Sequence, residues 1–227
     1  MAIAFTYPPS SAFGRIVPKT KIYDHAKATA GLKNKFVQQV DKIVWKYKLA
    51  PETINLAAGR GVPEIEVLWL MLKTPDLHDD VLRAIDRAIP FPLIFELHFQ
   101  DKIQVAAAYK RPNDADSAKW VVSDHFKSAW MPDNANRPPI PVALNLAGLY
   151  EKLLDPLLPS ETGAGEPLSV RVRRAEEIRA KERLLAQINA RLAKEKQFNR
   201  RIAINAERRA LKKELDDLAR RNARAGD

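Results

Sequence analysis

Four side chains in the N-terminal part of the sequence are of the types that a metal-dependent nuclease uses. Glu64 and Glu66 begin one apolar run, Glu96 lies inside a second, and Lys110 follows a third. Carboxylates at the ends of adjacent strands hold a divalent cation, and a lysine beside them helps position the attacking water. The spacing matches no nuclease pattern, because the second residue after Glu96 is His98 and not a lysine. Nuclease activity is one interpretation of these residues. The other is that Glu96 faces solvent from a half-exposed strand.

The other reactive side chains indicate no further enzyme class. The histidines are scattered without metal-ligand spacing (His25, His78, His98 and His125). The two glycines that flank Arg60 predict a turn and not a phosphate-binding loop, because no Gly-Lys-Ser or Gly-Lys-Thr follows. The sequence contains no Gly-x-Ser-x-Gly motif and no cysteine. We therefore assign no catalytic residue, no metal site and no cofactor from the sequence.

Residues 1–158 have the length and apolar content of one folded domain. Helical spacing, continuous apolar runs and proline positions predict its elements. The predicted elements are an extended segment over 13–23, a helix over 32–49, a strand over 64–73, a helix from 74 to 90, a hairpin of strands 93–99 and 103–109, a polar loop over 111–117, short strands over 120–123 and 126–130, and a helix over 146–158. Consecutive hairpin strands among helices predict an α+β fold, with a small mixed or antiparallel sheet and flanking helices.

The composition changes near residue 165. Residues 159–167 (PSETGAGEP) have the composition of a linker. Residues 168–225 contain no glycine, no proline and one aromatic residue, Phe198. Residues 166–227 hold 18 Lys and Arg against 10 Asp and Glu, a net charge of +8 out of +10 for the whole chain. We expect a long basic, coiled-coil-like helix over 168–225, which is about 80 Å long if it is continuous over 170–222.

Two blocks of apolar residues with heptad spacing follow one another in this predicted helix. The first block is Ile178, Leu185, Ile188 and Leu192, and the second is Ile204, Leu211, Leu215 and Leu218. The blocks are out of phase, and residues 194–204 absorb the slip if the helix is locally over- or underwound. This seam predicts self-association or packing against the parent domain, or else docking of another protein. Phe198 and Asn199 lie inside the slip, where they mark a docking point unless Phe198 fills a coiled-coil hole.

Basic residues recur in clusters along the same predicted helix. They are Arg171, Arg173, Arg174, Arg179, Lys194, Lys196, Arg200, Arg201, Arg208, Arg209, Lys212 and Lys213. Such clusters suit a phosphate backbone, because each neutralised phosphate releases counterions and arginine makes bidentate phosphate contacts. The alternative is a solvated face, since acidic residues such as Glu176, Glu182 and Glu195 lie three or four residues from a base, as intrahelical pairs do. If the helix binds DNA, we expect contacts to the backbone and not reading of the bases.

Several stretches of the sequence resemble one bacterial family. The runs FGRIVPKTKIY, FVQQVDKIVWKYKLAPETINL, EIEVLWLMLK, AIDRAIPFPLIFEL and AAAYKR, with KEKQFNRRIAINAERRALKKEL in the tail, are similar to the family called domain of unknown function 4391. The likeness covers residues 13–218. The family offers no established activity or catalytic residue to carry over. Its members are often encoded beside DNA methyltransferases and helicases of restriction-like or phage-defence systems, so the resemblance implies an accessory subunit of a DNA-handling defence complex.

Together, these patterns predict a non-enzymatic interaction protein. Its basic helix is expected to dock a larger partner such as a helicase or methyltransferase, to bind a second copy of the chain, or to contact the DNA backbone. The alternative is a metal-dependent nuclease-like domain whose basic helix clamps DNA. No apolar run approaches the roughly 20 residues of a membrane span, and the N-terminus does not read as a secretory signal. The absence of cysteine fits a reducing compartment, so we expect a cytoplasmic protein.

Overall fold

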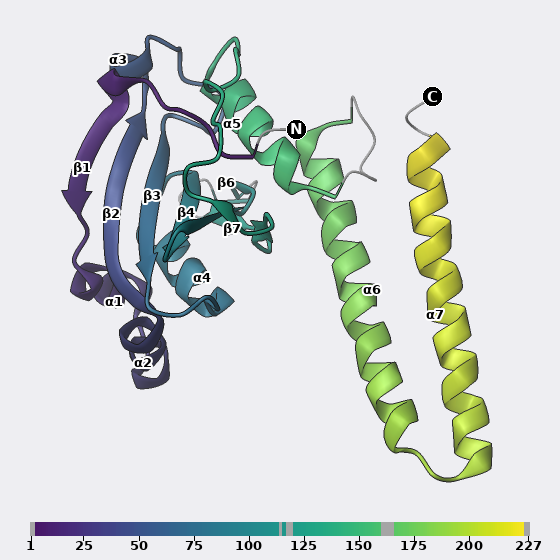
Figure 1. Cartoon of the computed structure of the whole chain (residues 1–227). Coiled ribbons are helices and arrows are strands. Elements are labelled where there is room, and N and C mark those ends of the chain that lie inside the picture. The colour runs from purple at the N-terminus through teal and green to yellow at the C-terminus, as the bar shows by residue number, and fades with distance from the viewer. Residues whose placement is uncertain (1–2, 114, 117–119, 160–165, 225–227) are drawn as a thin grey trace. The chain divides into compact units, whose positions relative to one another are not determined.

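The computed structural model describes residues 3–113, 115–116, 120–159 and 166–224 (Figure 1). The chain divides into two compact units, residues 1–157 and 158–227. The elements of the first unit are η1 Pro9–Ser11, β1 Ala12–Ile16, α1 Lys19–Ala26, α2 Ala30–Gln39, β2 Val40–Leu49, α3 Pro51–Ile54, β3 Ile65–Leu72, α4 Asp79–Ala88, β4 Leu93–Phe99, β5 Lys102–Ala107, β6 Lys110–Pro112, β7 Trp120–Val122, β8 Phe126–Lys127, β9 Met131–Pro132, α5 Leu146–Leu154 and η2 Asp155–Leu157. The second unit has α6 Leu168–Lys194 and α7 Phe198–Arg224.

The first unit is built on a seven-stranded mixed sheet. Its strands are ordered β1-β2-β3-β4-β5-β8, and β9 also pairs with β5. The first three strands are antiparallel neighbours, β3 and β4 run parallel, and β4 and β5 form an antiparallel hairpin. Helix α4 makes the crossover that two parallel strands require. β6 and β7 form a separate ribbon. The α+β fold predicted from the sequence is confirmed.

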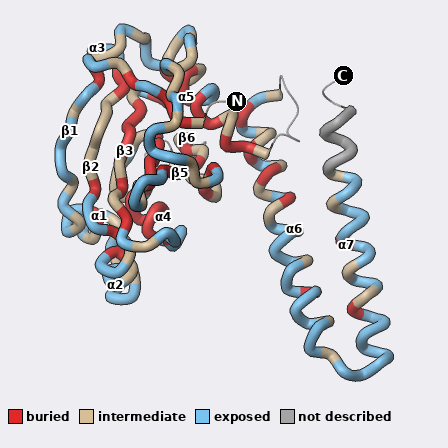
Figure 2. Tube along the Cα trace, in the orientation of Figure 1, coloured by how far each residue is buried: buried red, intermediate tan, exposed pale blue. Residues whose placement is uncertain are grey.

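Helices α1, α2 and α4 share a hydrophobic core with one face of this sheet. The core contains Leu68, Leu70, Phe95 and Leu97 from the strands and Phe36, Val81, Leu82 and Ile85 from the helices, all fully buried. Figure 2 shows the buried positions gathered along β3 and α4. Complete burial of one such side chain contributes about 1.5–3 kcal/mol. The strand predicted over 64–73 and the hairpin after it are confirmed, because their apolar runs form the centre of the sheet.

The helix predicted over 32–49 is wrong in its second half. Helix α2 ends at Gln39, and the chain continues directly into β2 at Val40. The hydroxyl of Thr29 accepts the N–H of Leu32 at 3.3 Å and caps the start of α2. β2 pairs with β1 on one side and β3 on the other, and its Val, Ile, Trp and Tyr side chains suit a strand. Their spacing fits a helix and a strand equally well, so tertiary pairing decides.

Two predicted starts also differ. The segment over 13–23 is extended only to Ile16, and α1 begins directly after Pro18. Proline has no backbone N–H to donate, and this is tolerated at the start of a helix, where the first N–H groups have no partner within the helix. The helix predicted from residue 74 begins at Asp79. Its cap is His78, whose Nδ1 accepts the N–H of Asp80 at 3.2 Å.

Three segments late in the first unit differ from their predicted limits. The first residues of the loop predicted over 111–117 belong to strand β6. The strand predicted over 126–130 is shorter and forms only β8. The helix predicted over 146–158 ends at Leu154, and the chain continues as η2. A polar partner caps α5, since the Asn145 Oδ1 accepts the N–H of Gly148 at 2.9 Å. These limits depend on pairing and caps, which apolar spacing does not encode.

The second unit is a helical hairpin and not one continuous helix. Helix α6 ends at Lys194, residues 195–197 reverse the chain, and α7 begins at Phe198, so that the two helices lie side by side (Figure 1). Within the predicted linker over 159–167, residues 160–165 lie outside the described residues. No helix in the described part of the chain has the apolar length that crossing a bilayer demands.

Candidate functional site

Three of the four nuclease-type side chains lie near one another in the structure. Glu66, on β3, is 2% exposed, and its neighbours include Glu64 and Lys110. Burial raises the pKa of Glu66 to about 8, and the adjacent Glu64 carboxyl adds to the shift. The Oε2 of Glu64 also pairs with Lys48 Nζ at 3.2 Å. These three side chains therefore lie near one another, but the nuclease interpretation requires Glu96 beside them as well.

The fourth candidate, Glu96, lies on the opposite face of the sheet. Glu66 pairs in register with Leu93, whereas Glu96 is three positions further along β4, and successive strand residues alternate between faces. The buried Glu96 carboxylate instead accepts a hydrogen bond from Arg137 Nη1 at 3.0 Å and lies 3.7 Å from His98 Nε2. The four candidates therefore do not share one site. Within the described ranges, no group of three or more histidine, aspartate and glutamate side chains is arranged to hold a metal ion.

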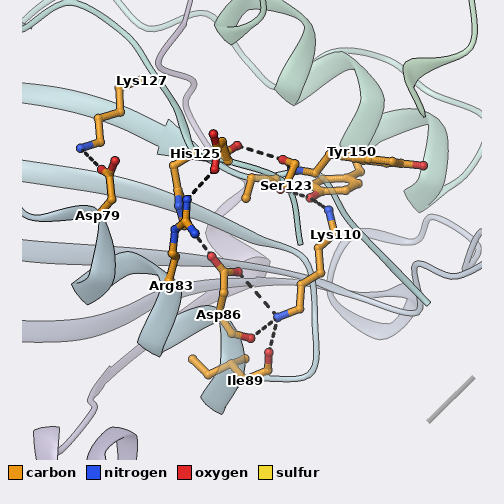
Figure 3. A network of polar contacts seen from close by, with 12 residues as sticks. Asp79, Arg83, Asp86, Ile89, Lys110, Ser123, His125, Lys127 and Tyr150 are labelled. Atoms are coloured by element: carbon orange, nitrogen blue, oxygen red, sulfur yellow. Dashed lines mark hydrogen bonds and ion pairs between the residues drawn. The ribbon is translucent and has the colours of Figure 1, made fainter. Parts of the chain in front are cut away.

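Lys110 instead closes the end of helix α4 (Figure 3). Its side chain is 1% exposed, and its ammonium group donates to the backbone carbonyls of Asp86 and Ile89, at 2.5 Å each. A cation that binds the last carbonyls of a helix satisfies acceptors which have no partner within the helix. The Asp86 carboxylate lies 3.6 Å away and supplies the opposite charge. Burial lowers the pKa of Lys110, and Asp86 opposes this shift.

A buried acid–histidine pair adjoins this lysine. The second oxygen of Asp86 is 2.6 Å from His125 Nε2, so the imidazole donates through that nitrogen. Such a pair would need a nucleophile to do acyl-transfer chemistry. The nearby Ser123 hydroxyl donates to the carbonyl of Asp124 at 2.9 Å and accepts the N–H of Tyr109 at 2.8 Å. The Ser123 hydroxyl is therefore hydrogen-bonded to the backbone in both directions and not to His125 in the contacts described.

Tyr150 extends the same network to helix α5. Its hydroxyl accepts the N–H of Lys110 at 3.0 Å and donates to the carbonyl of Ala108 at 2.5 Å. The contacts of Figure 3 thus tie α4, α5 and the segments around β6 and β8 to one another. Asp86 and its pairing with His125 were not predicted from the sequence. The sequence feature that could have indicated a buried carboxylate is an acidic residue among the apolar positions of a predicted helix.

A small cavity of about 230 Å³ opens beside this network. Two arginines of α4, Arg83 and Arg87, line it together with Trp120, Val122 and Ser123. Arg83 forms an ion pair with Asp124 at 2.5 Å, so part of the positive charge is neutralised. The cavity is smaller than the roughly 300 Å³ of a typical ligand pocket.

The second unit uses part of its predicted seam internally. Ile188 of α6 and Ile204 and Leu211 of α7 are buried against one another, with Leu185 and Leu192 packed beside them. Two ion pairs cross between the helices, Lys181–Glu214 at 2.6 Å and Arg191–Glu207 at 3.3 Å. The two heptad blocks therefore face each other in an antiparallel hairpin, which explains why they are out of phase.

The other residues predicted to bind a partner have different environments. Ile178 is buried, and Leu215 and Leu218 are half-buried. Phe198 and Asn199 are exposed at the start of α7, and Phe198 is not packed between α6 and α7. Whether any of these residues binds a partner stays a prediction.

Most of the predicted DNA-binding cations are exposed on the hairpin. Eight of the twelve are exposed, namely Arg173, Lys194, Lys196, Arg200, Arg201, Arg209, Lys212 and Lys213. The other four are half-buried, namely Arg171, Arg174, Arg179 and Arg208. Arg174 pairs with Glu166 at 2.7 Å. The acidic residues Glu207 and Glu214 pair with cations outside this set, across the hairpin.

The turn between the two helices concentrates positive charge. Its one carboxylate, Glu195, accepts the N–H of Gln197 at 2.8 Å, and its carbonyl accepts a weak contact from Arg201 at 3.4 Å. A shallow hollow of about 490 Å³ lies beside this turn, lined by three cations, Arg191, Lys194 and Arg200, and by the two carboxylates of Glu195 and Glu207. The arrangement suits anionic groups such as phosphates.

Comparison with known proteins gives one result. No curated protein and no solved structure matches the chain. The model of the family described as "Domain of unknown function (DUF4391)" matches residues 5–215, which is most of the chain. The protein therefore belongs to the DUF4391 family.

Proposed function

We propose that this protein is a non-enzymatic accessory subunit of a prokaryotic DNA-handling complex, and that its C-terminal hairpin contacts the DNA backbone. One observation carries the proposal: the hairpin buries apolar residues of its seam between its own helices and leaves eight of its predicted DNA-binding cations exposed. A surface of this kind favours binding through charge.

The distribution of charge supports this function. Residues 166–227 carry a net charge of +8, and the remaining residues carry +2. Clustered Lys and Arg side chains bind phosphates independently of base sequence, with counterion release as the driving force. Exposed arginines at the turn and on α7 add the bidentate geometry that phosphate oxygens accept.

The rest of the proposal concerns partners. The first unit would dock a larger protein such as a helicase or a methyltransferase of a restriction-like or phage-defence system, in the cytoplasm. The genomic setting that the family resemblance implies supports this part. Association of two copies of the chain is a further way to use the hairpin.

Substitution of exposed cations tests DNA binding. The variant Lys196→Gln, Arg200→Gln, Lys212→Gln, Lys213→Gln removes four charges from exposed positions that carry no packing. Fluorescence anisotropy with a 30-base-pair duplex of random sequence at 100 mM salt should show at least a tenfold loss of affinity.

A matched variant separates hairpin charge from total charge. Lys21→Gln, Lys27→Gln, Lys42→Gln, Lys102→Gln removes the same number of exposed cations from the first unit, and its affinity should stay within about twofold of the unmodified protein. Equal losses in the two variants, or an unmodified protein that binds neither duplex nor single-stranded DNA, would contradict the proposal.

A further inference from the structure

An aromatic side chain is exposed at the tip of the hairpin. Phe198 is 75% exposed, whereas Phe36, Phe95 and Phe126 in the first unit are fully buried. Ile202 follows one turn later on α7 and is 54% exposed. Residues four apart lie on the same side of a helix, so these two side chains form one apolar surface.

This apolar surface is surrounded by positive charge. Lys194, Lys196, Arg200 and Arg201 are all exposed within four residues of Phe198. One carboxylate, Glu195, lies among these cations and accepts the N–H of Gln197. The cations outnumber it, so an occupant with a flat apolar face and negative charge fits the tip.

We propose that Phe198 stacks on an unpaired nucleobase while the surrounding cations hold the adjacent phosphates, so that the hairpin tip prefers single-stranded or frayed DNA. This inference rests on the proposed function, DNA contact by the hairpin, and adds the state of the strand that its tip recognises. Every base has a π-face, so stacking of this kind is independent of sequence, and basic grooves with aromatic platforms are the usual design of single-strand binders.

Two other occupants fit the tip less well. A membrane surface is held by an extended apolar helix face, whereas the tip offers two apolar side chains. A second protein helix would pack against a continuous seam, but Ile188, Ile204 and Leu211 of the seam are buried inside the hairpin.

The test compares single-stranded and duplex DNA. A 15-nucleotide single strand and a blunt 15-base-pair duplex are titrated by fluorescence anisotropy with the unmodified chain, Phe198→Ala and Leu184→Ala. Leu184 is the matched control, an apolar side chain of α6 that is 47% exposed. Phe198→Ala should weaken single-strand binding about tenfold and leave duplex binding unchanged. Leu184→Ala should change neither.

A second readout reports stacking directly. The variant Phe198→Trp adds an indole at the tip, and its additional emission should be quenched by the single strand and not by the blunt duplex. Circular dichroism checks that each variant keeps its helices, which substitution of an exposed side chain should not disturb.

The outcomes separate this inference from the proposed function. If the unmodified chain binds neither DNA, the proposed function fails and the inference fails with it. If it binds duplex while Phe198→Ala matches the unmodified chain on single strands, only the stacking role is overturned. Equal losses on both DNAs also overturn it. Binding to anionic vesicles that is lost in Phe198→Ala, without an effect on single-strand binding, would assign the tip to membranes instead.

Discussion

At the scale of single residues, the first unit buries ionisable groups that contact one another and the backbone. Lys110 and Asp86 are both nearly inaccessible, yet each has several partners, so the charges stabilise the end of α4. The sequence singled out Lys110, and the structure gives it a different function from the one that a nuclease needs. Asp86 was not predicted, because Lys110 and His125 are far from it in the sequence and only the fold brings them into contact.

The buried lysine yields the first stability prediction. Lys110→Met leaves the Asp86 carboxylate without its cation and the carbonyls of Asp86 and Ile89, at the end of α4, without this donor, which should lower the free energy of unfolding by about 3–5 kcal/mol. Urea denaturation followed by circular dichroism measures this change. The partly exposed ion pair of Lys127 with Asp79 is the control, and Lys127→Met should cost less than about 1 kcal/mol. Comparable costs for the two variants would contradict the structural role of Lys110.

The second residue prediction concerns pH. Because the pKa of Glu66 is about 8 in the folded protein, against 4.5 ordinarily, the folded state keeps a proton that the unfolded chain releases. The unfolded chain then binds fewer protons between pH 4.5 and 8, so stability falls as the pH rises through this window. Glu66→Gln should reduce that fall between pH 5 and pH 8 by about 3 kcal/mol, measured by urea denaturation at each pH.

A neighbouring carboxylate provides the control for this pH effect. The hydrogen bond with Lys48 lowers the pKa of the exposed Glu52, so its proton is lost below the tested window. Glu52→Gln should therefore leave the difference between pH 5 and pH 8 unchanged. A Glu66→Gln variant with the same pH dependence as the unmodified protein would mean that Glu66 ionises normally.

At the scale of elements, apolar runs predicted the centre of the sheet correctly, and ambiguous spacing led to errors. β3, β4 and β5 were predictable because each is a short apolar run with turn residues beside it. Residues 40–49 were not, since Val40, Ile43, Val44 and Tyr47 satisfy helical spacing and only pairing with β1 and β3 makes them a strand. In the tail, the phase slip between Leu192 and Ile204 was the signal of a turn, although no glycine or proline marks it.

Chemical cross-linking tests the hairpin. Lys181 Nζ and Glu214 Oε2 are 2.6 Å apart, so a zero-length carbodiimide should join them by an amide bond within one chain. Peptide mass spectrometry of the monomer band should identify that bond, and Glu214→Gln should abolish it. Recovery of this bond only in a covalent dimer would indicate two extended helices from different chains in place of a hairpin.

At the scale of the whole molecule, the charge of the chain is divided unequally. The first 165 residues are close to neutral, whereas the last 62 hold most of the +10 net charge. Composition alone made this division predictable. The hairpin fold was not, and it changes the expected surface: one helix with an open apolar seam becomes two helices that bury much of that seam and expose their cations.

The salt dependence of duplex binding tests the central claim most directly. If the exposed hairpin cations replace counterions on the DNA, a plot of log K against log salt concentration should be linear, with a slope of about −4.5 to −7 for roughly five to eight phosphate contacts. The fourfold glutamine variant of the hairpin should reduce the slope by about 3 to 4, and the matched variant of the first unit should leave it unchanged. A slope near zero, or one that the hairpin variant does not alter, would contradict DNA contact by this hairpin.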